Sequence, residues 1–76
     1  MDLNKYIEIN PKVMMGKPVI KGTRITVEII LEKLSYGLAF SDTLQAYPTL
    51  TEDKIKAALA YAAESLQGDA IYPIAL

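Results

Sequence analysis

Apolar residues recur with a helical period from residue 27 onward, whereas the first 25 residues lack that period. Thr26, which suits a helix N-cap, stands just before the periodic stretch, and Gly37, which suits a helix end, follows it. A first helix is therefore predicted over about residues 27–36. Its apolar positions have the i, i+3, i+4 and i+7 spacing of one helix face: Val27, Ile30, Leu31 and Leu34.

Two further helices follow in the pattern. A short one is predicted from its N-cap, Ser41, to about Ala46, because a residue that precedes proline, here Pro48, avoids the α region. A longer one is predicted after its N-cap, Thr51, and should end at Gly68. Its apolar stripe, which we expect to face the core, consists of Ile55, Leu59, Ala62 and Leu66.

The first 25 residues favour extended structure. Residues 6–9 alternate apolar and polar side chains, which predicts a short strand. Residues 19–20 and 24–25, rich in β-branched side chains, flank a turn and predict a small hairpin or a bent extended stretch. Pro18 favours an edge position, because proline cannot donate to a strand ladder. Three glycines suit structural turns with a positive φ: Gly16, Gly22 and Gly37.

These elements predict one mainly α domain, a three-helix bundle preceded by a short strand or hairpin arm. Its parts are an extended or β arm over residues 1–25, a three-helix body over 26–67 and an apolar tail over 68–76. The short middle helix and the tight connection to the third helix are the outline of a helix-turn-helix.

The chain contains no cysteine and no histidine. These absences remove the usual ligands of zinc, copper, nickel and haem iron, and the commonest catalytic nucleophile and base. Glu28 and Glu32 are spaced i, i+4 on the first helix, but like charges at that spacing are typical of a solvated face. We therefore expect no metal site, no cofactor, no small-molecule substrate and no enzymatic activity.

The size of the chain favours association. Its 76 residues are 51% apolar and carry no disulfide, so we expect a partner to add stability, as in a homodimer. The N-terminal residues lack the apolar core of a signal peptide, and no run approaches the roughly 20 apolar residues of a membrane span. The expected location is the cytoplasm, without a membrane partner.

Charge is divided unequally along the chain. Residues 1–24 hold five basic and two acidic residues, a net charge of +3. Residues 25–76 hold three basic and seven acidic residues, a net charge of −4. The asymmetry suggests an anionic partner for the arm or head-to-tail association of two chains, and two modest solvated charge patterns are an equal alternative.

Two predicted helices have apolar residues away from the expected core face. Ile29 and Tyr36 lie together on the far side of the first helix, where either the arm or a second chain can cover them. On the outer face of the third helix, opposite the stripe, Tyr61 lies among small alanines such as Ala57 and suits a protein contact, although an exposed alanine-rich helix explains it equally. In the apolar tail, Tyr72 is a further candidate for partner binding.

The predicted third helix does not suit DNA reading. In a helix-turn-helix protein its first turn would face the major groove, yet here that turn contains Glu52 and Asp53, which phosphates repel. The candidates for contact with nucleic acid, and equally with an acidic protein, are therefore the basic residues of the arm: Lys17, Lys21 and Arg24.

Several motifs resemble those of a small prokaryotic family, domain of unknown function 433, over about residues 7–64. The most specific is Gly-Lys-Pro-Val-Ile-Lys-Gly-Thr-Arg-Ile, residues 16–25. The others are Asn10-Pro11, Gly37, Tyr47-Pro48, Leu50-Thr51 and Ala57-Ala58-Leu59-Ala60-Tyr61-Ala62.

The resemblance implies a homeodomain-like three-helix fold and the function of an antitoxin that neutralises a PIN-like ribonuclease toxin. In such a pair, Arg24, Lys21 or the apolar tail is expected to block the acidic metal pocket of the nuclease. The signature block is equally open to a structural role. A dimeric regulator that binds operator DNA, with or without a toxin partner, and a plain dimerisation module are the alternatives.

Overall fold

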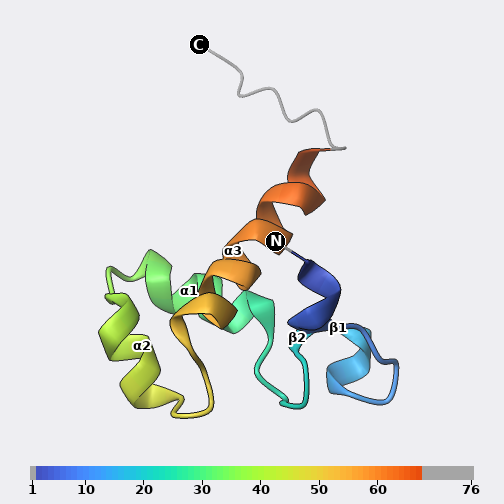
Figure 1. Ribbon diagram of the computed structural model, residues 1–76, viewed down its shortest axis with the longest axis horizontal. Helices are drawn as coiled ribbons and strands as arrows, with labels where there is room; N and C mark the ends of the chain where they lie inside the picture. The colour runs from blue at the N-terminus through green and yellow to red at the C-terminus, as the bar shows by residue number, and fades with distance from the viewer. Residues whose placement is uncertain (1, 68–76) are drawn as a thin grey trace.

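The computed structural model, drawn in Figure 1, describes residues 2–67. Within this range a short antiparallel pair of strands precedes three α-helices, which confirms the predicted fold class. The predicted helix end at Gly68, Tyr72 and the apolar tail lie outside the described residues. The elements are η1 (Leu3–Lys5), β1 (Ile7–Glu8), η2 (Met14–Gly16), β2 (Val19–Ile20), α1 (Val27–Ser35), α2 (Phe40–Ala46) and α3 (Glu52–Gln67), where η denotes a 3-10 turn.

The α1 helix begins and ends close to its predicted limits. Thr26 is its N-cap, because the side-chain hydroxyl accepts a hydrogen bond from the amide of Ile29 at 3.0 Å. At the other end, the amide of Gly37 donates to the carbonyl of Leu34 at 3.0 Å, and Gly37 has a φ of +86°. A glycine thus ends the helix in the left-handed conformation that other residues avoid.

The α2 helix begins earlier than predicted. Its first residue is Phe40, so the prediction of Ser41 as the N-cap is wrong. The Asp42 carboxylate accepts a hydrogen bond from the amide of Ala39 at 3.0 Å, and this contact fixes the helix start without a side-chain cap. The helix ends at Ala46, as Pro48 predicts.

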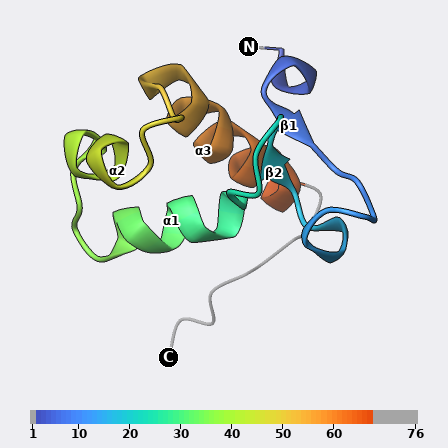
Figure 2. The ribbon, with the colours of Figure 1, turned by 90° about the horizontal axis from the view of Figure 1, so that it is seen from below.

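The N-terminal segment packs into the core and is not a free arm. Ile7 pairs with Ile20, and Glu8 with Val19, in an antiparallel ladder. The predicted turn after β2 is also present: the Ile20 amide donates to the Ile25 carbonyl at 2.9 Å, and Val19 and Thr26 form an antiparallel bridge. Figures 1 and 2 show this strand pair at one end of α1 and α2 at the other.

The core forms where α3 meets α1, α2, β1 and η1. Ile55 and Ala58 are fully buried on α3, but Leu59 is 38% exposed and Leu66 is 57% exposed, so the predicted core stripe is wrong beyond Ile55. Ala57, predicted on the outer face, is fully buried. The buried face of α3 is rotated because α1 and the N-terminal segment cover it from two sides. The buried apolar residues are Ile7, Val19, Ile20, Val27, Ile30, Leu50, Ile55, Ala57 and Ala58.

Within residues 2–67, no helix combines the length and the apolar character that a membrane crossing requires.

The N-cap of α1 provides a test of this fold. We expect Thr26→Ala to lower the free energy of unfolding by about 1–2 kcal/mol, because the Ile29 amide loses its acceptor and a buried site is emptied. Urea denaturation followed by circular dichroism measures this change. The control is Thr49→Ala, an exposed threonine outside the helices. Equal stabilities of the two variants would contradict the assignment of Thr26 as the cap.

Candidate functional site

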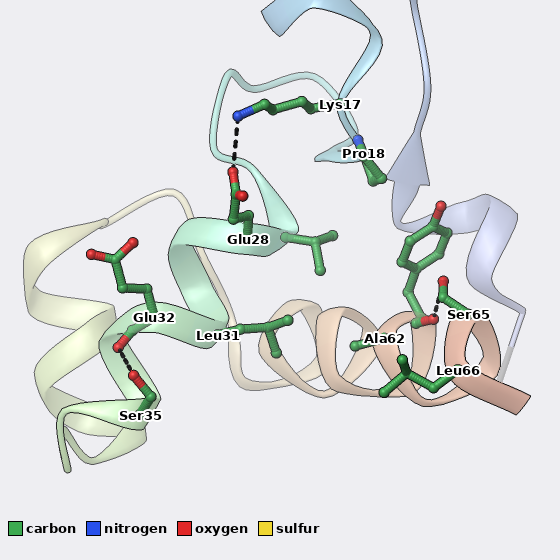
Figure 3. Close-up of a pocket in the computed structure, with 11 residues that line it drawn as sticks. Lys17, Pro18, Glu28, Leu31, Glu32, Ser35, Ala62, Ser65 and Leu66 are labelled. Atoms are coloured by element: carbon green, nitrogen blue, oxygen red, sulfur yellow. Dashed lines mark hydrogen bonds and ion pairs between the residues drawn. The ribbon is translucent and has the colours of Figure 1, made fainter. Parts of the chain in front are cut away.

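An open groove runs between α1 and the second half of α3 (Figure 3). Its volume is about 620 Å³, and its lining is mostly apolar. In Figure 3, Leu31 from α1 faces Ala62 and Leu66 from α3 across the hollow. The lining residues are Lys17, Pro18, Val27, Glu28, Leu31, Glu32, Ser35, Tyr61, Ala62, Ser65 and Leu66.

The groove exists because α3 is longer than the core beneath it. Ile55 and Ala58 are fully buried, and Ala62 and Ser65 continue the same side of the helix at spacings of four and three residues. Ala62 is only half-buried and Ser65 is exposed, since neither α1 nor the N-terminal segment reaches that far. The groove is therefore an uncovered continuation of the hydrophobic core.

Charged side chains lie only along the edge of the groove. Lys17 Nζ and Glu28 Oε1 form an ion pair at 2.9 Å, with 53% and 69% of the two side chains exposed. Because both side chains are so exposed, the ion pair contributes little to the stability of the fold. A charged group of a binding partner can therefore replace either member at a small cost in free energy.

The two serine hydroxyl groups in the groove already form hydrogen bonds within their own helices. Ser35 Oγ donates to the carbonyl of Glu32 at 2.6 Å, and Ser65 Oγ donates to the carbonyl of Tyr61 at 2.9 Å. An apolar ligand can therefore lie in the groove without leaving these hydroxyls unsatisfied.

The structure brings three of the predicted site residues together beside the groove. Lys17, Arg24 and Ile29 line a second hollow of about 410 Å³, which shares Lys17, Glu28 and Glu32 with the groove. Arg24 is exposed, and no described residue forms an ion pair with it. Of the predicted basic residues it is the best placed to reach a partner.

The other predicted residues are less available. Lys21 Nζ donates a hydrogen bond to the Asn4 carbonyl, so this lysine holds the N-terminal turn. Tyr61 is half-buried and forms one wall of the groove. Tyr36 is 71% exposed and covered by nothing in the described chain, so the arm does not sandwich it. Its hydroxyl donates to Glu32 at 3.2 Å, and this hydrogen bond and the negative charge raise the pKa of Tyr36.

Most of the groove residues were not predicted from the sequence. Pro18, Leu31, Ser65 and Leu66 were not among the predicted site residues, and Ala62 and Leu66 were expected in the core. A signal was present: the apolar stripe predicted on the third helix extends over residues 55–66, whereas that on the first covers only residues 27–34. The apolar stripe predicted on the third helix is therefore longer than the first helix can cover.

The described residues do not include a cluster of three or more acidic side chains that could hold a metal ion. The elements of the groove offer an apolar surface with charges at its edge, which suits the binding of a protein segment.

A family model described as a protein of unknown function, DUF433, matches residues 7–62. The chain belongs to the DUF433 family. A crystal structure of a DUF433 member from Anabaena variabilis ATCC 29413 is 30% identical, with a TM-score of 0.79. This match covers 87% of the present chain and 65% of the Anabaena chain.

A curated relative is the uncharacterised protein y4eO of Sinorhizobium fredii (strain NBRC 101917 / NGR234), which is 35% identical over 65 residues. The match covers 84% of the present chain but only 29% of y4eO. The DUF433 chain therefore spans less than a third of this relative and just under two thirds of the Anabaena chain.

The signature block of this DUF433 chain, residues 16–25, is largely structural. Gly16 and Gly22 have φ values of +81° and +79°, as their predicted turn role requires. Thr23 Oγ1 donates to the Ile20 carbonyl at 2.7 Å and accepts from the Ile25 amide at 3.0 Å. The Arg24 side chain, by contrast, forms no hydrogen bond or ion pair with the described residues and is exposed.

A second unusual turn precedes the block. Met14 and Met15 have φ values of +48° and +58°, a region that is unfavourable for residues with a side chain. Met15 is also 92% exposed. The sequence carries no signal for this left-handed turn, because methionine has no preference for it.

The role of Gly22 can be tested directly. A Cβ at this position meets no atom within 4 Å, so Gly22→Ala should act only through the positive φ and destabilise the domain by about 1–2 kcal/mol. Gly22→Asn should cost less, because asparagine tolerates the left-handed region. Urea denaturation of both variants checks this. A stable alanine variant with altered partner binding would instead indicate a functional glycine.

Proposed function

We propose that this DUF433 protein is a cytoplasmic antitoxin that binds a PIN-like ribonuclease through protein–protein contact and blocks its active site. The observation that carries the proposal is the open apolar groove with Arg24 beside it. The antitoxin role itself rests on the family resemblance, and the groove supplies a surface of the kind that binding a protein requires.

The charges on α3 favour a protein partner over DNA. Glu52 and Asp53 lie exposed in its first turn. Its two lysines are both engaged: Lys56 pairs with Glu52 at 3.2 Å, and Lys54 donates to the Thr49 carbonyl at 3.0 Å. A helix with this first turn repels phosphates at the position where a recognition helix reads bases.

The proposed mechanism has two parts. An apolar segment of the nuclease seats in the groove against Leu31 and Leu66, which supplies most of the affinity. Arg24 then lies at the side of the contact and can enter an acidic pocket that would otherwise hold the divalent cation of the nuclease. The guanidinium is permanently charged and binds carboxylates in a bidentate manner.

The groove part is tested by Leu66→Glu. The side chain is 57% exposed, so the fold should survive, whereas a carboxylate in the groove should weaken nuclease binding about tenfold or more. Calorimetry with a candidate PIN-like nuclease measures the affinity. The matched control is Leu38→Glu, 38% exposed and outside the groove, which should bind normally. Equal affinity of both variants would exclude the groove as the contact.

The inhibitory part is tested by Arg24→Ala. We expect this variant to bind the nuclease but to inhibit RNA cleavage much less, because the groove contact remains and the active site is no longer blocked. Lys12→Ala, another exposed basic residue of the N-terminal segment, is the control. An RNA cleavage assay at saturating antitoxin separates the two variants. Full inhibition by Arg24→Ala would contradict the mechanism.

A second candidate function is binding of operator DNA by a homodimer, which would allow the protein to regulate its own operon. The net charge of +3 on residues 1–24, with Arg24 exposed, favours this possibility. A gel-shift series on the promoter should show affinity that falls steeply as salt rises, and less steeply for Arg24→Ala. An affinity for DNA that does not change with salt concentration would argue against contact through these basic residues.

A further inference from the structure

The apolar groove opens where the described chain ends. The last two residues that line it, Ser65 and Leu66, are in the final turn of α3, which ends at Gln67. We propose that the segment that follows, residues 69–76 of the same chain, seats in the groove when no partner is bound. This inference does not depend on the partner being a nuclease.

The segment is long enough for this contact. Eight residues in an extended conformation reach about 26–29 Å. The α1 wall of the groove, from Val27 to Ser35, is only about 12 Å long at the helical rise. Gly68 stands between α3 and the segment, and a glycine permits the reversal that would direct the chain back along α1.

The chemistry of the segment matches that of the groove. Its last six residues are Ile71, Tyr72, Pro73, Ile74, Ala75 and Leu76, none of them charged. Leu31, Ala62 and Leu66 offer apolar contacts on the two walls. Because the groove is open along one side, the backbone amides and carbonyls of an occupant can still bind water. Pro73 also carries no amide hydrogen that would need a partner.

The charges at the edge of the groove are compatible with this occupant. Asp69 is the one charged residue of the segment, and Lys17 is at the edge of the groove with half of its side chain exposed. The covalent connection raises the local concentration of the segment, so an individually weak apolar contact can form within one chain. A partner that uses the groove must then displace the segment, which makes the segment a competitor of that partner.

The absence of cysteine permits a direct experiment on the full chain. Ala75→Cys introduces one thiol for a nitroxide spin label, whose unpaired electron broadens the NMR signals of nearby residues. We expect the amides of Leu31 and Ala62 to lose most of their intensity, while those of α2, at the far end of α1, keep theirs. Equal intensities with oxidised and reduced label would overturn the proposal.

Three further samples make the result specific. Ile74→Glu in the labelled chain should restore the groove signals, whereas Asp69→Asn should not; unchanged broadening in the glutamate variant would overturn an apolar contact. A mixture of spin-labelled chain with isotope-enriched unlabelled chain should show no broadening. Broadening in that mixture would assign the groove to a second copy and would equally overturn the proposal. All samples lack the nuclease, so the outcome is separate from that of the antitoxin test.

Discussion

The contact of α1 with α3 is the constraint on which the rest of the molecule depends. Ile30 of α1 belongs to the same buried cluster as Ile55 and Ala58 of α3, and all three are fully buried. In so small a domain two helices cannot enclose a core by themselves. The third side is closed by Ile7, Val19 and Ile20 of the N-terminal segment, which is why that segment folds as a strand pair.

The same contact creates the groove. The α3 helix has 16 residues and α1 has nine, so their apolar faces coincide over only part of their length. Beyond Ala58 the core-facing side of α3 is only partly covered, since Ala62 is half-buried and Leu66 is exposed. An apolar surface in this position costs free energy in water until something covers it. The covering segment, whether from the same chain or from a partner, would therefore add stability as well as binding.

The helix-turn-helix outline of this DUF433 protein does not by itself imply that the protein binds DNA. Binding of bases by a helix-turn-helix requires positive charge around its third helix, and here Glu52 and Asp53 lie at that position. The fold thus supplies a rigid frame, and the exposed residues decide what it can bind. In the signature block most residues shape turns and strands, whereas Arg24 extends from that frame into solvent.

The sequence by itself determined the elements, because their signals are local. Helical periodicity, the cap at Thr26, the turn glycines and the stop before Pro48 each act within a few residues, and the structure confirms them. Only the tertiary structure decided which faces are buried. Ala57 enters the core and Leu66 remains outside, because burial depends on segments more than 20 residues away in sequence. The unequal lengths of the two predicted stripes indicate that part of α3 extends beyond α1, but the residues that line the groove and the position of Arg24 beside it follow from the long-range arrangement.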